Sequence, residues 1–326
     1  MDNDTSEFLL WEFSKIREIQ VMHIALLLTL FLITVTGNLV IIAAVVSDHH
    51  LHTPMYFFLM NLAMQDIGSV SVFIPKAIFN SLMNIRTISH SVAQVLFFLF
   101  FTGCDVSLLA VMAYDRYIAI CNPLQYEMIM NRKACMKMVD SVWTASLLNT
   151  TLHTIVNFIT PFCSNIINQF FCEIPYLLKI ACSDLYVTKI GVLIFSVTLG
   201  IGCFSFVILT YVHVFSAVLR IPSVQGRKKA FSTCLPHLIV FSIFTFTSCF
   251  GYLKPVADSP SYLDFILTIM YSIIPPVLNP LIYGMRNKDI KSSVSRLFGQ
   301  KLLLLKENEL CVFLFLNFNR KVKKQT

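Results

Sequence analysis

Of the ionisable residues inside long apolar stretches of the chain, four are the first candidates for chemistry. Asp66 and Asp105 stand alone, whereas Asp115 and Arg116 are adjacent. A charge inside a membrane costs several kcal/mol unless it faces a bundle interior or a partner, so each one marks a candidate functional site. Two carboxylates could hold a cation or share a proton, and an adjacent Asp and Arg could form an ion pair that a helix movement breaks.

The two isolated carboxylates also have a simpler interpretation. Each could accept a hydrogen bond from a nearby polar side chain, for instance that of Asn38 or Asn279. The sequence leaves both interpretations open. We therefore group Asn38, Asp66 and Asp105 as a candidate polar or cation site within the membrane.

Membrane-spanning helices are the elements that must position these residues. Of the 326 residues, 56% are hydrophobic and only 13% are charged, about half the charged fraction of an ordinary soluble domain. A helix needs about 20 apolar residues to cross a bilayer. The sequence therefore predicts an all-α membrane protein, a seven-transmembrane helix bundle whose helices cover Val21–Ser47, Pro54–Asn80, Ile88–Cys121, Val139–Ile159, Gly191–Arg220, Lys229–Leu253 and Tyr262–Gly284.

Basic residues predict the orientation of the bundle. With the N-terminus outside, 18 of the 25 Lys and Arg residues lie in cytoplasmic segments, which the positive-inside rule favours. We divide the chain into an extracellular N-terminus at 1–20, the bundle at 21–284, a short amphipathic eighth helix at 285–298 and a cytoplasmic tail at 299–326. The net charge of +7 then reflects topology and contact with membrane lipid, and it predicts no nucleic acid partner.

Several other functions are excluded by missing residues. A retinal protein needs a lysine in the last helix, and Tyr262–Gly284 contains none. An intramembrane aspartyl protease needs a Gly-x-Gly-Asp motif, which the sequence lacks. The two halves show no internal repeat, which argues against an inverted-repeat transporter. We predict a protein that is not an enzyme and that has no cofactor and no metal site.

Four runs of residues make a specific pattern. The first surrounds the adjacent Asp and Arg and reads MAYDRYIAICNPL. With these runs the sequence resembles an odorant receptor of the rhodopsin-like G-protein-coupled receptor family, over about residues 7 to 298. The runs are Met112–Leu124, Leu51–Leu59, Lys229–Leu238 without Leu235, and Pro275–Tyr283.

This resemblance implies a switch that couples to a heterotrimeric G protein with a stimulatory Gα, which raises cAMP. Arg116 would engage the G protein in the active state, and Asp115 would restrain it in the inactive one. Pro280 would permit a kink in helix seven because proline lacks a backbone N–H. The residues implied for the switch are Asp115, Arg116, Tyr117, Tyr211, Asn279, Pro280 and Tyr283.

The same resemblance implies a ligand site in the outer half of the bundle. Its lining would be mostly apolar with a few hydroxyl groups, which suits a small hydrophobic odorant held by burial. No carboxylate stands at the helix-three positions of this site, which argues against an amine ligand. The implied ligand-binding residues are Phe98, Thr102, Phe195, Leu199, Ser248, Tyr252, Ile269 and Ser272.

The cysteines depart from the family pattern. The resemblance implies a disulfide from Cys172, in the long outer loop, to the top of helix three, but Ser91 stands at that second position. A bridge between Cys163 and Cys182 within the loop stays open. Without the helix-three bridge the loop loses a constraint typically worth about 2–4 kcal/mol.

The expected location is the plasma membrane, with the N-terminus outside. Asn3 begins an Asn-Asp-Thr glycosylation sequon in that segment. The missing disulfide keeps an alternative open, in which the chain is a non-signalling membrane protein of receptor ancestry, retained in the endoplasmic reticulum.

Overall fold

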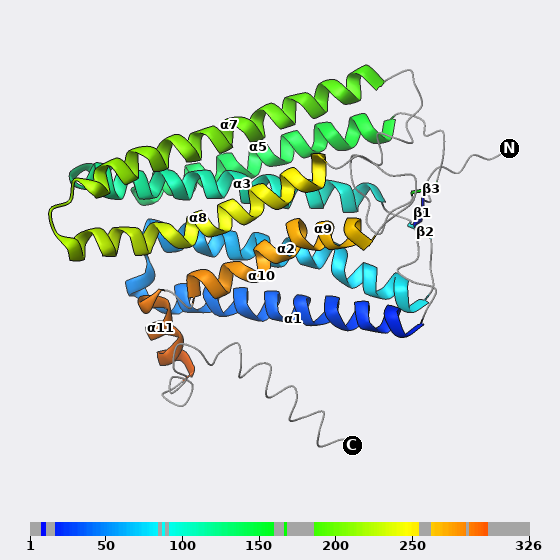
Figure 1. Ribbon diagram of the computed structural model, residues 1–326, viewed down its shortest axis with the longest axis horizontal. Coiled ribbons are helices and arrows are strands. Elements are labelled where there is room, and N and C mark those ends of the chain that lie inside the picture. The colour runs from blue at the N-terminus through cyan, green and yellow to red at the C-terminus, as the bar shows by residue number, and fades with distance from the viewer. Residues whose placement is uncertain are drawn as a thin grey trace.

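The computed structural model describes residues 8–10, 17–83, 87–88, 91–159, 166–167, 186–253, 262–284 and 287–298. Nearly all of them are helical, and the long helices run side by side as one bundle (Figure 1). The seven-helix architecture predicted from the sequence is confirmed. The long helices are α1 (Arg17–Ser47), α2 (Pro54–Met83), α3 (Ser91–Cys121), α5 (Arg132–Ile159), α7 (Tyr186–Leu219) and α8 (Val224–Leu253), and a broken seventh helix follows them.

Five of the long helices are apolar and long enough to cross a membrane, namely α1, α2, α3, α7 and α8. The pair Ile266–Ser272 and Ile274–Gly284, bent by 48°, makes a sixth span if it is counted as one. Helix α5, with 28 residues, is only slightly shorter than the others, but it is less apolar. Its apolar side chains, such as Leu148 and Ile155, are exposed, whereas the polar His153 and Thr154 are buried. Because its polar groups face the other helices and its apolar ones face outward, α5 fits the same bundle.

The seventh helix is not the single segment that the sequence predicted. It consists of α9 (Tyr262–Ser272), a break at Ile273, α10 (Ile274–Asn279) and a π-helical turn at Pro280–Gly284. Three prolines in this stretch remove backbone N–H donors, so the regular ladder of helical hydrogen bonds cannot continue. The axes of the two halves of the helix therefore differ in direction by 48°.

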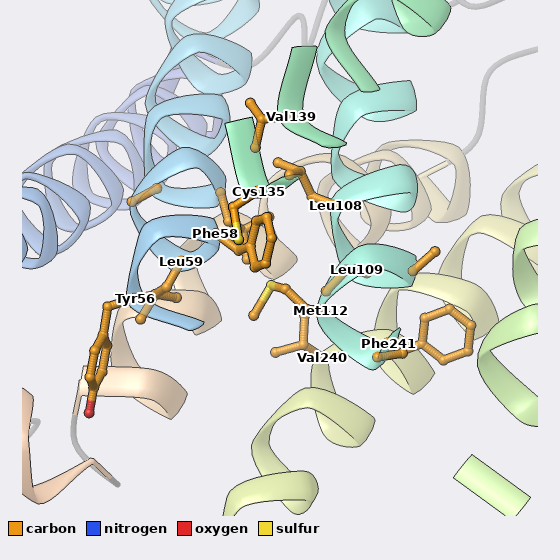
Figure 2. Close-up of a cluster of buried hydrophobic side chains, with 14 of the residues drawn as sticks. Tyr56, Phe58, Leu59, Leu108, Leu109, Met112, Cys135, Val139, Val240 and Phe241 are labelled. Carbon is orange, nitrogen blue, oxygen red and sulfur yellow. The ribbon is translucent and has the colours of Figure 1, made fainter. Parts of the chain in front are cut away.

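Helix α3 lies at the centre of the packing. It contacts α2, α5, α7 and α8. Figure 2 shows Phe58 from α2, Leu108 and Met112 from α3, Cys135 from α5 and Val240 from α8 converging in one cluster. All five are almost fully buried. This cluster fixes the cytoplasmic half of α3, which carries the adjacent Asp and Arg.

Short elements lie at the two ends of the bundle. At the predicted cytoplasmic end are η1 (His49–Leu51), η2 (Pro123–Gln125), α4 (Tyr126–Ile129) and α11 (Lys288–Phe298). Helix α11 is the predicted amphipathic eighth helix, and its Ile290 is buried. At the opposite end lies a small sheet of β1 (Phe8–Leu10), β2 (Thr87–Ile88) and β3 (Ile166–Ile167), which the all-α prediction did not contain (Figure 1). Ile88 therefore lies in a strand, and the third helix begins at Ser91.

Candidate functional site

The carboxylate of Asp115 is buried near the cytoplasmic end of α3 and has two partners within the part of the chain that the structure describes. Arg116 Nη2 lies 3.2 Å from Asp115 Oδ2, which makes an ion pair within the helix. The hydroxyl of Tyr126, at the start of α4, donates to Asp115 Oδ1 over 2.7 Å. Burial and the neighbouring carboxylate raise the pKa of the Tyr126 phenol, so it stays protonated as a donor. The hydrogen bond from Tyr126 therefore holds the loop after α3 to the ion pair.

Sequence reasoning missed Tyr126. The short η2 helix, which begins with Pro123, turns the chain so that Tyr126 returns to α3. A tyrosine beyond the predicted end of a helix carries no signal of its own. The contact depends on the turn and on the distance it spans, and neither is visible in a pattern of residue types.

A histidine inside α8 joins three helices. His237 Nε2 lies 2.9 Å from the backbone oxygen of Leu109 in α3, and Nδ1 lies 2.8 Å from the hydroxyl of Tyr211 in α7. A carbonyl oxygen only accepts, so Nε2 must carry the hydrogen, and in the neutral ring Nδ1 then accepts from Tyr211. His237 is buried. Tyr211, predicted as a switch residue, is therefore held by His237, which also contacts Leu109 of α3.

His237 was also missing from the predicted site, although the sequence offered a signal. An ionisable residue within an apolar span is a candidate by default. The same rule that selected the carboxylates applies to this histidine, which directly follows Pro236.

The predicted switch residue Tyr117 lies on the side of α3 that faces α7. Its ring contacts that of His213 at 6.2 Å between centroids, in an edge-to-face arrangement. It also stacks near Tyr114, one turn earlier. Aromatic side chains therefore fill the contact between α3 and α7 beside Arg116.

Gly37 and Asn38 in α1 together hold the kinked part of helix seven. Proline at 280 has no N–H, so the backbone oxygen of Pro276 lacks its normal helical donor. Asn38 Nδ2 donates to that oxygen over 3.2 Å, and also to Thr34 over 3.0 Å. A Cβ atom at Gly37 would lie only 2.8 Å from the ring of Pro280. The glycine allows the close approach, and the asparagine replaces the lost hydrogen bond.

The two isolated carboxylates are both buried, but they differ in their partners. Asn279 Nδ2 lies 3.1 Å and 2.9 Å from the two carboxylate oxygens of Asp66. For Asp66, this is the hydrogen bond from a nearby polar side chain that the simpler interpretation of the sequence predicts. Asp105 interacts electrostatically with Asp66, and within the described residues its Oδ1 accepts no hydrogen bond.

Two further observations bear on this polar cluster. In the described part of the chain, His, Cys, Asp and Glu side chains form no group of three or more that could hold a metal ion. The hydroxyl of Tyr283, in the π-helical turn, is buried without a hydrogen-bond partner among these residues. The arrangement therefore contains polar atoms whose bonding capacity is unused.

Two of the predicted ligand residues, Phe98 and Ile269, pack into one cluster near the outer half of the bundle. The ring of Phe98 contacts those of Phe73 and Tyr271 at 6.0 Å and 6.5 Å between centroids. Phe98 packs against the cluster that contains Ile269. Ser272 is buried one turn later, and within the described residues its hydroxyl has no partner. Apolar surface and one free hydroxyl thus lie along α3 and α9.

The remaining ligand candidates lie elsewhere. Thr102 and Ser248 are half-buried, on α3 and α8. Phe195 and Leu199 are 51% and 49% exposed on α7, so the structure does not bring them into the Phe98 cluster. The side chain of Tyr252 lies outside the described residues, as do Asn3, Cys163, Cys172 and Cys182.

The orientation of α7 has a visible cause. Ser196 donates to Asn149 Oδ1 of α5 over 2.8 Å, and His153 Nε2 lies 2.6 Å from the same hydroxyl. Because these bonds turn Ser196 toward α5, its neighbour Phe195 lies on another face of the helix. Because most residues of α7 are apolar, its sequence does not indicate how the helix is rotated about its axis.

Comparisons with known proteins agree with the pattern of runs. A family model described as "Olfactory receptor" matches residues 27–301. Human olfactory receptor 14I1 is 45% identical over 311 residues, 94% of this chain and 100% of the relative. Human olfactory receptor 14J1 is 42% identical over 301 residues, 91% of this chain and 94% of the relative. Gorilla olfactory receptor 1G1 is 42% identical over 295 residues, 90% of this chain and 94% of the relative.

Proposed function

Because this chain belongs to the olfactory receptor family, a family of odorant-sensing G-protein-coupled receptors, we propose that it acts at the plasma membrane and raises cAMP through a stimulatory Gα. The observation that carries this proposal is the Asp115–Arg116 ion pair, whose carboxylate also accepts a hydrogen bond from Tyr126 in the following loop. A buried ion pair at a helix end, held by a second element, is suited to a two-state switch. The protein is a multi-pass membrane receptor and not an enzyme.

In the proposed cycle, this structure corresponds to the restrained state. Arg116 is engaged by Asp115, and Tyr211 is engaged by His237, so neither side chain is available to a partner. A shift of α8 away from α3 would separate His237 from Leu109 and release Tyr211. The released tyrosine and Arg116 would then contribute to the surface that receives Gα.

We propose that the odorant lies against Phe98 and Ile269, with the hydroxyl of Ser272 as its hydrogen-bonding partner. Burial of apolar ligand surface would supply most of the affinity, at about 25 cal/mol per Å². The hydroxyl of Ser272, which has no hydrogen-bond partner among the described residues, would orient a ligand carbonyl or hydroxyl. The other expected lining residues, Thr102, Phe195, Leu199, Ser248 and Tyr252, stay predictions.

A surface measurement tests the function and separates it from the alternative. Cells expressing an N-terminally tagged chain are labelled without permeabilisation, and cAMP is measured during exposure to a panel of volatile compounds. We expect surface labelling and a concentration-dependent cAMP response. A chain that stays inside the cell would support the alternative of a non-signalling protein retained in the endoplasmic reticulum.

An exposed leucine on the cytoplasmic side provides a sharper test of coupling. Leu124 is fully exposed in η2, and Met128 is 68% exposed in α4. Burial of one leucine is worth about 1.5–3 kcal/mol, so if Gα covers it, Leu124→Ala should lower odorant potency roughly 10- to 100-fold. The matched control is Gln125→Ala, the exposed neighbour, which should leave potency unchanged. If odorant potency were equal for Leu124→Ala and Gln125→Ala, Leu124 would not be part of the surface that contacts Gα.

The intramembrane cation site also stays a proposal. Asp66 and Asp105, with Asn279 and Asn38, would hold one monovalent cation or share one proton between the carboxylates. If a cation binds, odorant potency should differ severalfold between sodium and choline at constant ionic strength, and Asp105→Asn should abolish that difference. Asp140→Asn, an exposed carboxylate of α5, serves as the control. A potency that follows pH and ignores sodium would favour the shared proton instead.

A further inference from the structure

The N-terminal strand β1 is the centre of the small outer sheet. It pairs antiparallel with β2, with Phe8 opposite Ile88 and Leu9 opposite Thr87. On its other edge it pairs parallel with β3, with Leu9 opposite Ile166 and Leu10 opposite Ile167. The strand order is β2-β1-β3, so within the described residues β2 and β3 are joined only through β1.

The two strands joined in this way belong to the two segments of the chain that the family disulfide would connect. β2 ends at Ile88, and α3 begins at Ser91, where the family pattern has a cysteine. β3 belongs to the long outer loop, the same loop that contains Cys172. A serine cannot form the bridge. The sheet therefore connects the segment just before α3 to the long loop, the two parts of the chain that this disulfide would otherwise join.

We propose that the N-terminal segment substitutes for this disulfide by holding the long outer loop to the start of α3 through backbone hydrogen bonds. Only residues 11–16 separate β1 from α1, so the strand is tethered close to the rim of the bundle. A short tether keeps the effective concentration of the strand high, which favours pairing without a covalent bond. Unlike a disulfide, this connection is lost when β1 is removed or cannot pair.

The register gives a direct test by cysteine pairs. Residues opposite one another in a sheet lie on the same face, whereas neighbours in the chain alternate between faces. Oxidation of membranes carrying Leu9→Cys with Thr87→Cys should give a linked peptide, detected by mass spectrometry of the unreduced protein. The control, Phe8→Cys with Thr87→Cys, places the two thiols on opposite faces and should give little or none. Equal linkage in both, or linkage in neither, would overturn the proposal.

A second pair protects this test against a variant that fails to fold. Leu9→Cys with Ile166→Cys examines the other edge of β1 and uses the same peptide analysis. We expect linkage here as well, because β1 must hold both neighbours to act as the connection. Linkage to β2 alone would show that the long loop is not held by this strand, and the proposal would fail.

The role of the strand is tested by surface level and does not depend on any odorant or G protein. Leu9→Pro removes an N–H from the central strand and should lower the surface fraction severalfold, whereas Leu9→Ala keeps the backbone and should lower it less. Adding Ser91→Cys to Leu9→Pro supplies the cysteine that the family pattern places there. We expect this addition to restore the surface fraction. A Leu9→Pro variant at the full surface level would contradict the proposal.

Discussion

Arg116→Ala is expected to abolish odorant-dependent cAMP production while the receptor still reaches the cell surface. Arg116 is only 14% exposed and is held by Asp115 in the restrained state. In the proposed active state its guanidinium would instead contact Gα. Truncating one partner of a buried, hydrogen-bonded charge pair costs roughly 2–5 kcal/mol, a factor of about 30 to several thousand in affinity.

The design needs a control that removes an arginine from the same side of the molecule. Arg132 is exposed at the start of α5, so Arg132→Ala removes the same charge without touching the ion pair. We expect Arg132→Ala to respond like the original chain. An unchanged response in Arg116→Ala, at matched surface levels, would refute the proposed switch mechanism.

Basal cAMP production by Arg116→Ala distinguishes two roles of Arg116: holding the bundle in the inactive state and contacting Gα. Without Arg116, the carboxylate of Asp115 keeps, among the described residues, only the hydrogen bond from Tyr126. If the ion pair served only to hold the bundle closed, its loss would raise cAMP in the absence of odorant. We expect basal cAMP to fall or stay low, because the arginine itself is required for contact with Gα.

Gly37→Ala is expected to destabilise the bundle, although alanine is the better helix former. The new Cβ would lie 2.8 Å from Cγ and 2.9 Å from Cβ of Pro280. A proline ring on a kinked helix cannot turn away as a long side chain can, so α1 and the seventh helix must move apart. Overpacking of this kind costs typically 1–3 kcal/mol, which corresponds to a melting temperature lower by roughly 2–12 °C.

Separation of these helices would also lengthen the bond from Asn38 to the Pro276 oxygen. That oxygen would then lose the donor that replaces the missing proline N–H. An unsatisfied buried carbonyl adds its own cost of about 1–3 kcal/mol. The measurement is thermal unfolding of the purified receptor in detergent, with the surface fraction in cells as a second readout.

The matched control for this substitution is Gly200→Ala in α7. Beyond its own helix, a Cβ at Gly200 would meet no atom of the described residues within 4 Å, so only the gain in helix propensity remains, about 0.5–1 kcal/mol. We expect Gly200→Ala to melt at the same temperature or slightly higher. If both variants shifted alike, the close approach of Gly37 to Pro280 would carry no weight in the stability of the bundle.

Much of the fold followed from the sequence because a bilayer leaves the chain few choices. Backbone groups in hydrocarbon must be paired within the segment, so long apolar stretches become helices whatever their partners. The polar exceptions were visible for the same reason. Asp66, Asp115 and Arg116 stood out against apolar neighbours, and the adjacency of the last two already allowed the ion pair that the structure contains.

The contacts that join separate segments were decided only by the tertiary structure. The bonds of Tyr126 to Asp115, of Tyr211 to His237 and of Asn38 to Pro276 depend on how helices rotate and how closely they approach. Hydropathy is nearly uniform around an apolar helix, so it leaves that rotation undetermined. Phe195 shows the consequence, since a hydrogen bond of its neighbour Ser196 turns it away from the proposed ligand cluster.

The outer sheet is the clearest case of structure beyond the reach of the sequence. The strands β1, β2 and β3 contain only two or three residues each, too few to show an alternating pattern. The sequence by itself determined a seven-helix membrane receptor that lacks one cysteine. Only the tertiary structure showed which segment lies between the two regions that the cysteine would have joined, because that pairing requires three distant parts of the chain to meet.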